Sequence, residues 1–197
     1  MTQNFASAGV YLIQTFFGLY TFLVMLRFLM QVARADYYNP ISQGIVKLTD
    51  PAIRPLRKLF PTVYGVDLAT LCLAFLVQLA AIMIIMALYG YAFFALNYVA
   101  WVLLGLFAII FKIYFFALLV SVVASWIAPA SNHPALSLVY QLIEPICAPA
   151  RKLLPPMGGI DFSIILVFVF INLIDSYLVI QPLSVFLGVP RGLILGL

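Results

Sequence analysis

The chain is built around residues 39–67, NPISQGIVKLTDPAIRPLRKLFPTVYGVD, because the sequence contains a second copy of this segment. The copy is residues 133–161, HPALSLVYQLIEPICAPARKLLPPMGGID, and the two align without a gap. Ten of the 29 aligned positions are identical, and most of these are Pro, Gly, Asp or a basic residue. Such a match indicates an internal duplication. We call the two segments the first insert and the second insert, because each lies between two apolar stretches.

The composition is that of an integral membrane protein. Of the 197 residues, 66% are hydrophobic and only 8% are charged, and the mean hydropathy is +1.18; soluble domains have about 25% charged residues. Residues 1–26 and 68–111 contain no charged side chain. A helix needs about 20 apolar residues to cross a bilayer, so the second run is long enough for two crossings. The N-terminal run has no basic residues before it, and Arg27 follows it, so we expect a permanent span and not a signal peptide.

The pattern predicts an all-α integral membrane protein with four transmembrane helices. The expected spans are about residues 8–33, 67–89, 99–127 and 162–180. Two spans in each half make the halves parallel tandem repeats, about 8–90 and 99–182, within a single membrane domain. An apolar tail, 183–197, follows, and it either lies in the outer interface or folds back against the helices.

The basic residues predict the orientation. Apart from Lys112, which lies inside a span, nearly all of them lie in or beside the inserts, and Arg191 is the exception. Loops rich in Lys and Arg stay in the cytoplasm. We therefore expect a multi-pass protein of the bacterial inner (plasma) membrane, with both inserts cytoplasmic and both termini outside.

Each insert is expected to form an amphipathic helix-turn-helix. In the first insert, Asn39 is a candidate N-cap with Pro40 at the first helical position, and Asp50 would cap a second helix that starts at Pro51. Pro55 would kink or shorten that second helix. Such segments lie flat in the membrane interface; a shallow re-entrant hairpin is the alternative.

Acidic and basic residues of the inserts have separate expected roles. The acids Asp67 and Asp161, and likewise Asp50 and Glu144, are expected to cap helices, and cation coordination is the alternative for them. The basic cluster would contact anionic lipid, which is the negative surface beside cytoplasmic membrane ends. Its members are Arg54, Arg57, Lys58, Arg151 and Lys152. A cytosolic partner is possible at this surface, whereas no direct contact with nucleic acid is expected.

Ionisable residues inside spans are candidates for function by default. On regular helices Lys112 and Asp175 lie within about 6 Å of the same depth, so we expect them to pair. The pair would either lock two helices together or help an ion or polar solute to pass. Gln78 and Asn172 are equivalent positions of the two repeats and could hydrogen-bond to each other. Asn172, Asp175 and Ser176 form one polar stripe; the commoner role of such a stripe is to join helices, and a hydrated path is the alternative.

Nothing in the sequence points to catalysis. It has no nucleotide-binding glycine loop, no zinc-ligand spacing and no nucleophile beside a base. Cys72 and Cys147 would lie in or near the membrane and do not make a disulfide framework. His133 precedes Pro134 at the position of Asn39 and is interpreted as a cap. We expect no enzyme, no metal and no cofactor.

The duplicated motif resembles that of the YggT family of small bacterial membrane proteins, over nearly the whole chain. Its pattern is acid-Pro-x-x-x-Pro-x-Arg-Lys/Arg-x-x-Pro followed by Gly-x-Asp. The pattern falls on Asp50, Pro51, Pro55, Arg57, Lys58, Pro61, Gly65 and Asp67, and again on Glu144, Pro145, Pro149, Arg151, Lys152, Pro155, Gly159 and Asp161. The second copy departs from the first in having Ala148 where the first has Arg54.

The resemblance implies a role in osmotic or salt stress, with some members linked to potassium uptake. Relatives in photosynthetic organisms are linked to assembly of a haem-bearing membrane complex and to nucleoid or thylakoid organisation, and Gram-positive ones to cell division. Two hypotheses follow. One is support of ion flux by a homo-oligomer, since four spans leave little room for a path in one protomer. The other is a non-catalytic scaffold or assembly factor that acts on a membrane-protein partner through its basic cytoplasmic face.

Overall fold

The computed structural model describes residues 2–63, 65–127, 131–154, 161–190 and 192–193. Helices make up most of this part of the chain. They are α1 (Thr2–Val32), α2 (Pro40–Leu56), α3 (Leu68–Leu88), α4 (Leu96–Ile127), α5 (Pro134–Leu153), α6 (Phe162–Leu173), the π-helix η1 (Ile174–Leu178) and α7 (Ile180–Phe186). Two short antiparallel strands, β1 (Thr62–Val63) and β2 (Val66–Asp67), join α2 to α3.

Four segments of the described chain are long and apolar enough to cross a membrane. They are Ser7–Val32 in α1, α3, α4, and the run Phe162–Phe186 that combines α6, η1 and α7. Many of their large apolar side chains are exposed, for example Phe16 at 66% and Phe107 at 57%. Such a surface would be unfavourable in water and is suited to lipid. The chain is therefore a multi-pass membrane protein.

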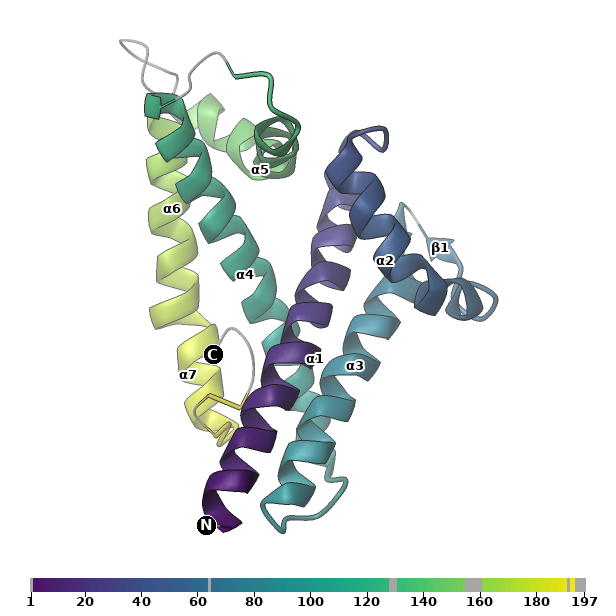
Figure 1. Ribbon diagram of the computed structural model, residues 1–197. Helices are drawn as coiled ribbons and strands as arrows, with labels where there is room; N and C mark the ends of the chain where they lie inside the picture. The colour runs from purple at the N-terminus through teal and green to yellow at the C-terminus, as the bar shows by residue number, and fades with distance from the viewer. Residues whose placement is uncertain (1, 64, 128–130, 155–160, 191, 194–197) are drawn as a thin grey trace.

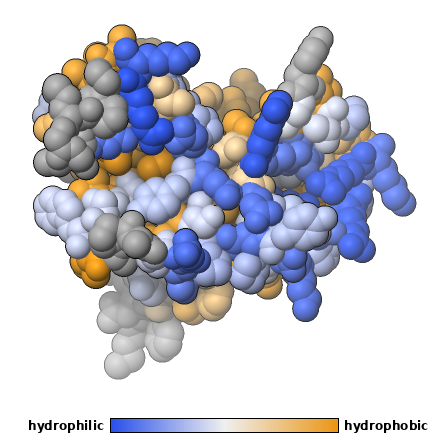
Figure 2. Space-filling view, turned by 90° about the horizontal axis from the view of Figure 1, so that it is seen from above, coloured by the Kyte–Doolittle hydropathy of each residue, from blue (hydrophilic) through white to orange (hydrophobic). Residues whose placement is uncertain are grey.

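Both inserts lie at the same end of the molecule, which we call the insert end (Figure 1). Helices α1 and α4 run toward this end, and α3 and α6 run away from it. The two inserts touch there, where the Asn39 side-chain amide donates to the Pro134 carbonyl at 2.7 Å. Just before the first insert, the Asp36 backbone N–H also donates to the Gln141 side chain at 2.7 Å. Viewed from this end, hydrophilic residues gather on it, most densely on the side of α2 and β1 (Figure 2).

The core lies between the long helices. Helix α3 presents Ala69, Ala74 and Ala81, all buried, and packs along α1 over much of its length. Small residues let helix backbones approach closely in a membrane, where no hydrophobic effect drives helices together. Larger buried side chains, Met25 of α1, Ile82 of α3 and Ile109 of α4, fill the space where these helices meet.

Each insert forms one continuous helix, so the expected helix-turn-helix is wrong. Helix α2 runs through Pro51 and Pro55, and α5 runs through Pro145 and Pro149. In each helix the prolines are four residues apart and exposed. The carbonyl groups that lose an N–H partner therefore face outward, where water or lipid headgroups can bind them.

The fourth span extends beyond Pro182, where we expected it to end. Pro182 lies in the first turn of α7, and its missing N–H removes no hydrogen bond there. After α7 the chain folds back against the long helices. Gln14 of α1 donates to the Gly192 carbonyl at 2.6 Å, and Leu193 is buried. This part of the tail thus packs against the bundle. Arg191 and residues 194–197 lie outside the described residues.

Candidate functional site

Asp50 of α2 is the centre of an ion-pair cluster in the first insert. Its carboxylate lies 2.9 Å from Arg27 of α1, 2.6 Å from Arg54 and 3.9 Å from Arg57. Asp50 therefore does not cap a helix, contrary to our expectation, because the continuous α2 places it in the helix interior. Its role is to join α2 to α1.

Arg27 is the buried partner in this cluster, with a relative exposure of 6%. Besides Asp50 it donates to the Thr49 hydroxyl at 2.8 Å and to the Val46 carbonyl at 3.2 Å. Sequence reasoning missed this role and treated Arg27 only as a flanking charge. The available signal was that Arg27 interrupts an apolar run that continues to residue 33, since an arginine in such a position needs a partner.

Asp67 connects the end of α2 to the start of α3. It is fully buried, and Arg57 donates to its Oδ2 at 2.8 Å. The same carboxylate caps α3: Oδ1 accepts from the backbone N–H of Ala69 at 3.1 Å, and Oδ2 accepts from the Thr70 hydroxyl at 2.9 Å. Gly65, at φ +83°, lies in the tight turn between the two strands that deliver Asp67 to this place.

The second insert repeats this connection. Arg151 lies 2.9 Å from Asp161 and 2.8 Å from Glu144. Asp161 caps α6 by accepting from the backbone N–H of Ser163 at 3.0 Å and from the Ser163 hydroxyl. Glu144, like Asp50, lies inside its helix and caps nothing. Pro155 and Gly159 of the motif lie outside the described residues.

These contacts shift the acidity of the groups. The hydrogen bond from Arg27 lowers the pKa of Asp50, against the effect of burial. Burial raises the pKa of Asp67, but the hydrogen bonds from Arg57 and Thr70 outweigh it, so that the net pKa is below the ordinary value. The same balance lowers the pKa of Asp161, with Ser163 and Arg151 as donors. All three carboxylates are therefore ionised at neutral pH.

The remaining basic residues are free to face the surroundings. Arg54 has 77% of its side chain exposed although it touches Asp50. Lys58 and Lys152 are exposed and take part in none of the ion pairs between described residues. The basic cluster thus has two kinds of member, namely Arg57 and Arg151, which hold the inserts to the spans, and Arg54, Lys58 and Lys152, which extend outward.

Lys112 and Asp175 line one cavity of about 180 Å³ but do not form the expected ion pair. No nitrogen–oxygen distance between them falls within 4.0 Å among the ion pairs of the described chain. The reason is the wide turn of η1, which replaces the regular α-helix at Asp175 and alters where its side chain points. One carboxylate oxygen of Asp175 is buried with no hydrogen-bond partner. Asn172 lines the same cavity, whereas exposed Ser176 does not.

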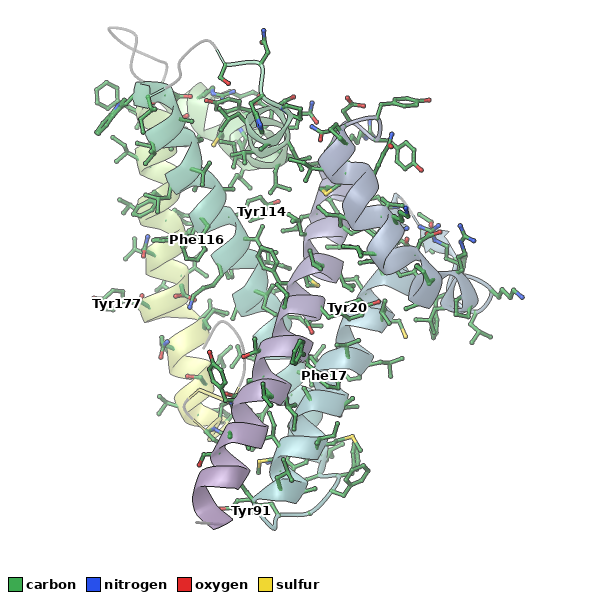
Figure 3. The ribbon with its side chains drawn as sticks, in the orientation of Figure 1. Phe17, Tyr20, Tyr91, Tyr114, Phe116 and Tyr177 are labelled. Carbon is green, nitrogen blue, oxygen red and sulfur yellow. The ribbon has the colours of Figure 1, made fainter. Side chains whose placement is uncertain are left out.

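The side chains in and near η1 differ in exposure. Tyr177, 74% exposed, points away from the helices on the outer side of η1 (Figure 3). Tyr114 of α4, in contrast, is buried and lies toward α1 in the same view. Asp175 thus lines its cavity from a helix in which Ser176, Tyr177 and Leu178 are exposed.

Gln78 and Asn172 do not meet, contrary to our expectation. Asn172 donates to the Phe168 carbonyl of its own helix at 2.8 Å. Gln78, 6% exposed, has neither its amide nitrogen nor its amide oxygen hydrogen-bonded, and it lines a different cavity of about 340 Å³ beside Gln14 and Thr21 of α1. The two equivalent amides have thus taken different positions in the two halves.

The described residues contain no group of three or more His, Cys, Asp or Glu side chains placed to hold a metal ion. Cys72 and Cys147 are both free, and burial raises the pKa of Cys147 to about 11. A thiol of that acidity is protonated at neutral pH and a poor nucleophile.

Four apolar spans and two charged inserts, each tied to the next span by an arginine–aspartate pair, define a small multi-pass membrane protein with a duplicated half. The chain belongs to the CCB3/YggT family, which it matches twice, over residues 6–88 and 100–182. The second match begins 94 residues after the first, which is the same offset that relates the two inserts.

The relatives are bacterial. The chain is 44% identical over 189 residues to uncharacterized protein PA0392 of Pseudomonas aeruginosa, with 95% of each chain covered. It is 37% identical over 153 residues to uncharacterized protein YggT of Escherichia coli, which covers 78% of this chain and 79% of the relative. It is also 35% identical over 159 residues to an uncharacterized protein of Haemophilus influenzae, with 79% and 83% covered. No solved structure matches the chain.

Proposed function

We propose that this protein is a non-catalytic scaffold or assembly factor of the bacterial inner membrane, which acts through the basic face of its insert end. In this proposal the two repeats are parallel, α2 and α5 lie in the cytoplasmic interface, and both termini are outside. The role in osmotic and salt stress that the family resemblance implies would then follow from organising lipid or a membrane-protein partner.

The observation that carries this proposal is the division of α2 into two faces. Its buried residues, Ser42, Ile45, Thr49 and Ile53, recur every three or four positions and pack against the spans. Arg54 and Lys58 lie on the exposed part of the same insert. A helix of this kind suits the boundary between apolar lipid and anionic headgroups. The gathering of Lys and Arg at one end supports a cytoplasmic placement of that end.

The test reverses only the outward charges, because Arg57 and Arg151 hold the fold together. The variant Arg54→Glu, Lys58→Glu, Lys152→Glu should insert and fold normally, yet fail to restore salt tolerance in a strain that lacks its own copy. A charge-conserving control, Lys58→Arg with Lys152→Arg, should restore it. Full tolerance with the reversed variant, present at normal abundance, would refute the scaffold proposal.

The intramembrane cavity lined by Lys112, Asn172 and Asp175 supports a second candidate, ion flux by an oligomer. An unpaired carboxylate oxygen inside a span is expensive to maintain, and π-turns are frequent at functional sites. In liposomes, a purified oligomer should then conduct potassium, and Asp175→Asn should reduce the flux at least several-fold. Absence of flux from an intact wild-type oligomer would eliminate this candidate and leave the scaffold.

A further inference from the structure

A pocket of about 560 Å³ opens between the end of α1, the link to α2, and α2 itself. Three arginines, Arg27, Arg34 and Arg57, line it together with a single acidic residue, Asp50. The lining is therefore positive overall. Arg34 takes part in none of the ion pairs between described residues, so its charge is available to a ligand.

Arg34 occupies a backbone position that the chain elsewhere gives to glycine. Three helices end in the same pair of hydrogen bonds, from residues at C′ and C″ back into the last turn, which is the Schellman arrangement. After α3 and α7 the left-handed C′ residue is Gly90, at φ +79°, and Gly188, at φ +63°. After α1 it is Arg34, at φ +53°, the one non-glycine residue of the described chain with positive φ. Any side chain disfavours this conformation. An arginine at this position therefore places its guanidinium beside the pocket at the expense of backbone strain.

Ser42 gives a second and independent sign of a ligand. Its side chain is 1% exposed and lines the same pocket, yet its hydroxyl has no hydrogen-bond partner. Buried hydroxyl groups are almost always hydrogen-bonded. An acceptor in the pocket would complete its bonding.

The second insert cannot form an equivalent pocket. The positions 94 residues after Arg27 and Arg34 are Ser121 and Ala128. Ser121 donates to the Leu118 carbonyl of its own helix at 2.7 Å. The positive pocket is thus a property of the first half alone, unlike the arginine–aspartate connection, which both halves share.

We infer that this pocket binds a phosphate group, and that in the membrane this is the phosphate of an anionic lipid headgroup. Guanidinium groups match the oxygens of a phosphate in planar, two-pronged hydrogen bonds. Ser42 and Gln31, which also lines the pocket, add neutral donors. The inference rests on the proposed function, which places the insert end at the headgroup level, and deepens it by naming one lipid site. A free phosphate compound shares this chemistry, so the test includes both.

The test measures the thermal stabilisation of purified full-length protein in a neutral detergent on titration with phosphatidylglycerol. Parallel titrations use phosphatidylcholine and inorganic phosphate. We expect stabilisation by phosphatidylglycerol, and little by the other two. Arg34→Gly should weaken phosphatidylglycerol binding about tenfold, which corresponds to the loss of one charge-assisted hydrogen bond. Its fold should be at least as stable as that of the wild type, because glycine relieves the left-handed strain.

Two further variants complete the comparison. Ser42→Ala removes the buried unpaired hydroxyl and should also weaken binding. Lys47→Ala removes one exposed charge from α2 outside the pocket and should leave binding unchanged. Unchanged affinity for phosphatidylglycerol in Arg34→Gly, or an equal loss of affinity in Lys47→Ala, would refute the proposal that this pocket is the binding site. Equal stabilisation by inorganic phosphate would overturn the lipid source. If the pocket fails while salt tolerance still requires Arg54, Lys58 and Lys152, the scaffold proposal stands without it.

Discussion

At the residue scale, Arg27 holds the first insert to the first span. Its side chain is buried and has three charged or polar partners, which are the Asp50 carboxylate, the Thr49 hydroxyl and the Val46 carbonyl. A buried arginine without such partners would be very unfavourable in a membrane protein. The partners all come from α2, so this one side chain ties that helix to α1, in addition to the packing of the buried residues of α2.

Replacing Arg27 should therefore destabilise the fold. Arg27→Met keeps the apolar stem but removes the guanidinium, and we expect a loss of roughly 2–3 kcal/mol in the free energy of unfolding, since breaking a buried ion pair leaves the remaining carboxylate under-compensated. The value lies at the low end because Asp50 keeps Arg54. Unfolding in mixed detergent micelles measures it. Arg54→Ala, which removes an exposed partner, should cost less than about 1 kcal/mol. Equal losses in the two variants would contradict the anchoring role of Arg27.

The sequence was sufficient to place Asp67 and Asp161 but not Asp50. The first two follow a turn and precede an uncharged run, so a position at a helix start is readable from the chain. Asp50 precedes a proline in the same way, and there the rule fails, because a helix can continue through an exposed proline. The partner of Asp50, Arg27, lies 23 residues away, and no local pattern connects the two.

At the element scale, the two inserts and the fourth span show what helical periodicity leaves open. Apolar spacing predicted helices in the inserts, but whether one helix or two formed depended on which way the prolines faced. In the fourth span, counting along a regular helix placed Asp175 against Lys112, and the π-turn of η1 invalidates that count. Such a turn has no reliable sequence signal, so the sequence placed Lys112 and Asp175 at a similar depth but could not show that they do not pair.

The arginine–aspartate connections predict how stability depends on pH. The pKa values of Asp50, Asp67 and Asp161 are lowered in the folded state. An unfolded aspartate takes up a proton near pH 4, so below that pH the unfolded chain binds more protons than the folded chain. The stability that these groups contribute is complete above about pH 5 and is lost as the pH falls through about 4 toward the folded pKa values.

We therefore expect the unfolding temperature to be nearly constant from about pH 7 to about pH 5 and to fall below about pH 4. Asp67→Asn should be less stable than the wild type at neutral pH and should show a smaller fall in acid. Asp36→Asn is the matched control, because Asp36 is exposed, its Oδ1 accepts from the backbone N–H of Tyr38, and it takes part in no ion pair between described residues. A wild-type curve that rises in acid would show that the carboxylates do not act in this way.

At the scale of the whole molecule, the two halves share a frame and differ in their polar groups. Both join insert to span through Arg57 with Asp67 or Arg151 with Asp161. The first half alone carries a buried arginine in its leading span, and the second half alone places a carboxylate inside a span. Duplication thus accounts for the shared frame, whereas the arginine-lined pocket belongs to the first half and the cavity lined by Lys112 and Asp175 belongs to the second.

If the halves are parallel, both inserts must lie on the same side of the membrane. Lys58 and Lys152 are exposed in the two inserts, and Tyr91, 64% exposed, lies at the opposite end of the molecule (Figure 3). One new cysteine is introduced at a time at these positions, in a chain that carries Cys72→Ala and keeps Cys147. The new cysteines at the two ends should react with a membrane-impermeant maleimide from opposite sides of the membrane. Tyr91→Cys should react in cells with a permeabilised outer membrane, and Lys58→Cys and Lys152→Cys only in inverted vesicles. The buried, protonated Cys147 should contribute little background. Labelling of Lys58→Cys and Lys152→Cys from different sides would refute the parallel arrangement. Labelling of both from outside would leave the parallel arrangement intact but show that the orientation in the membrane is the opposite one.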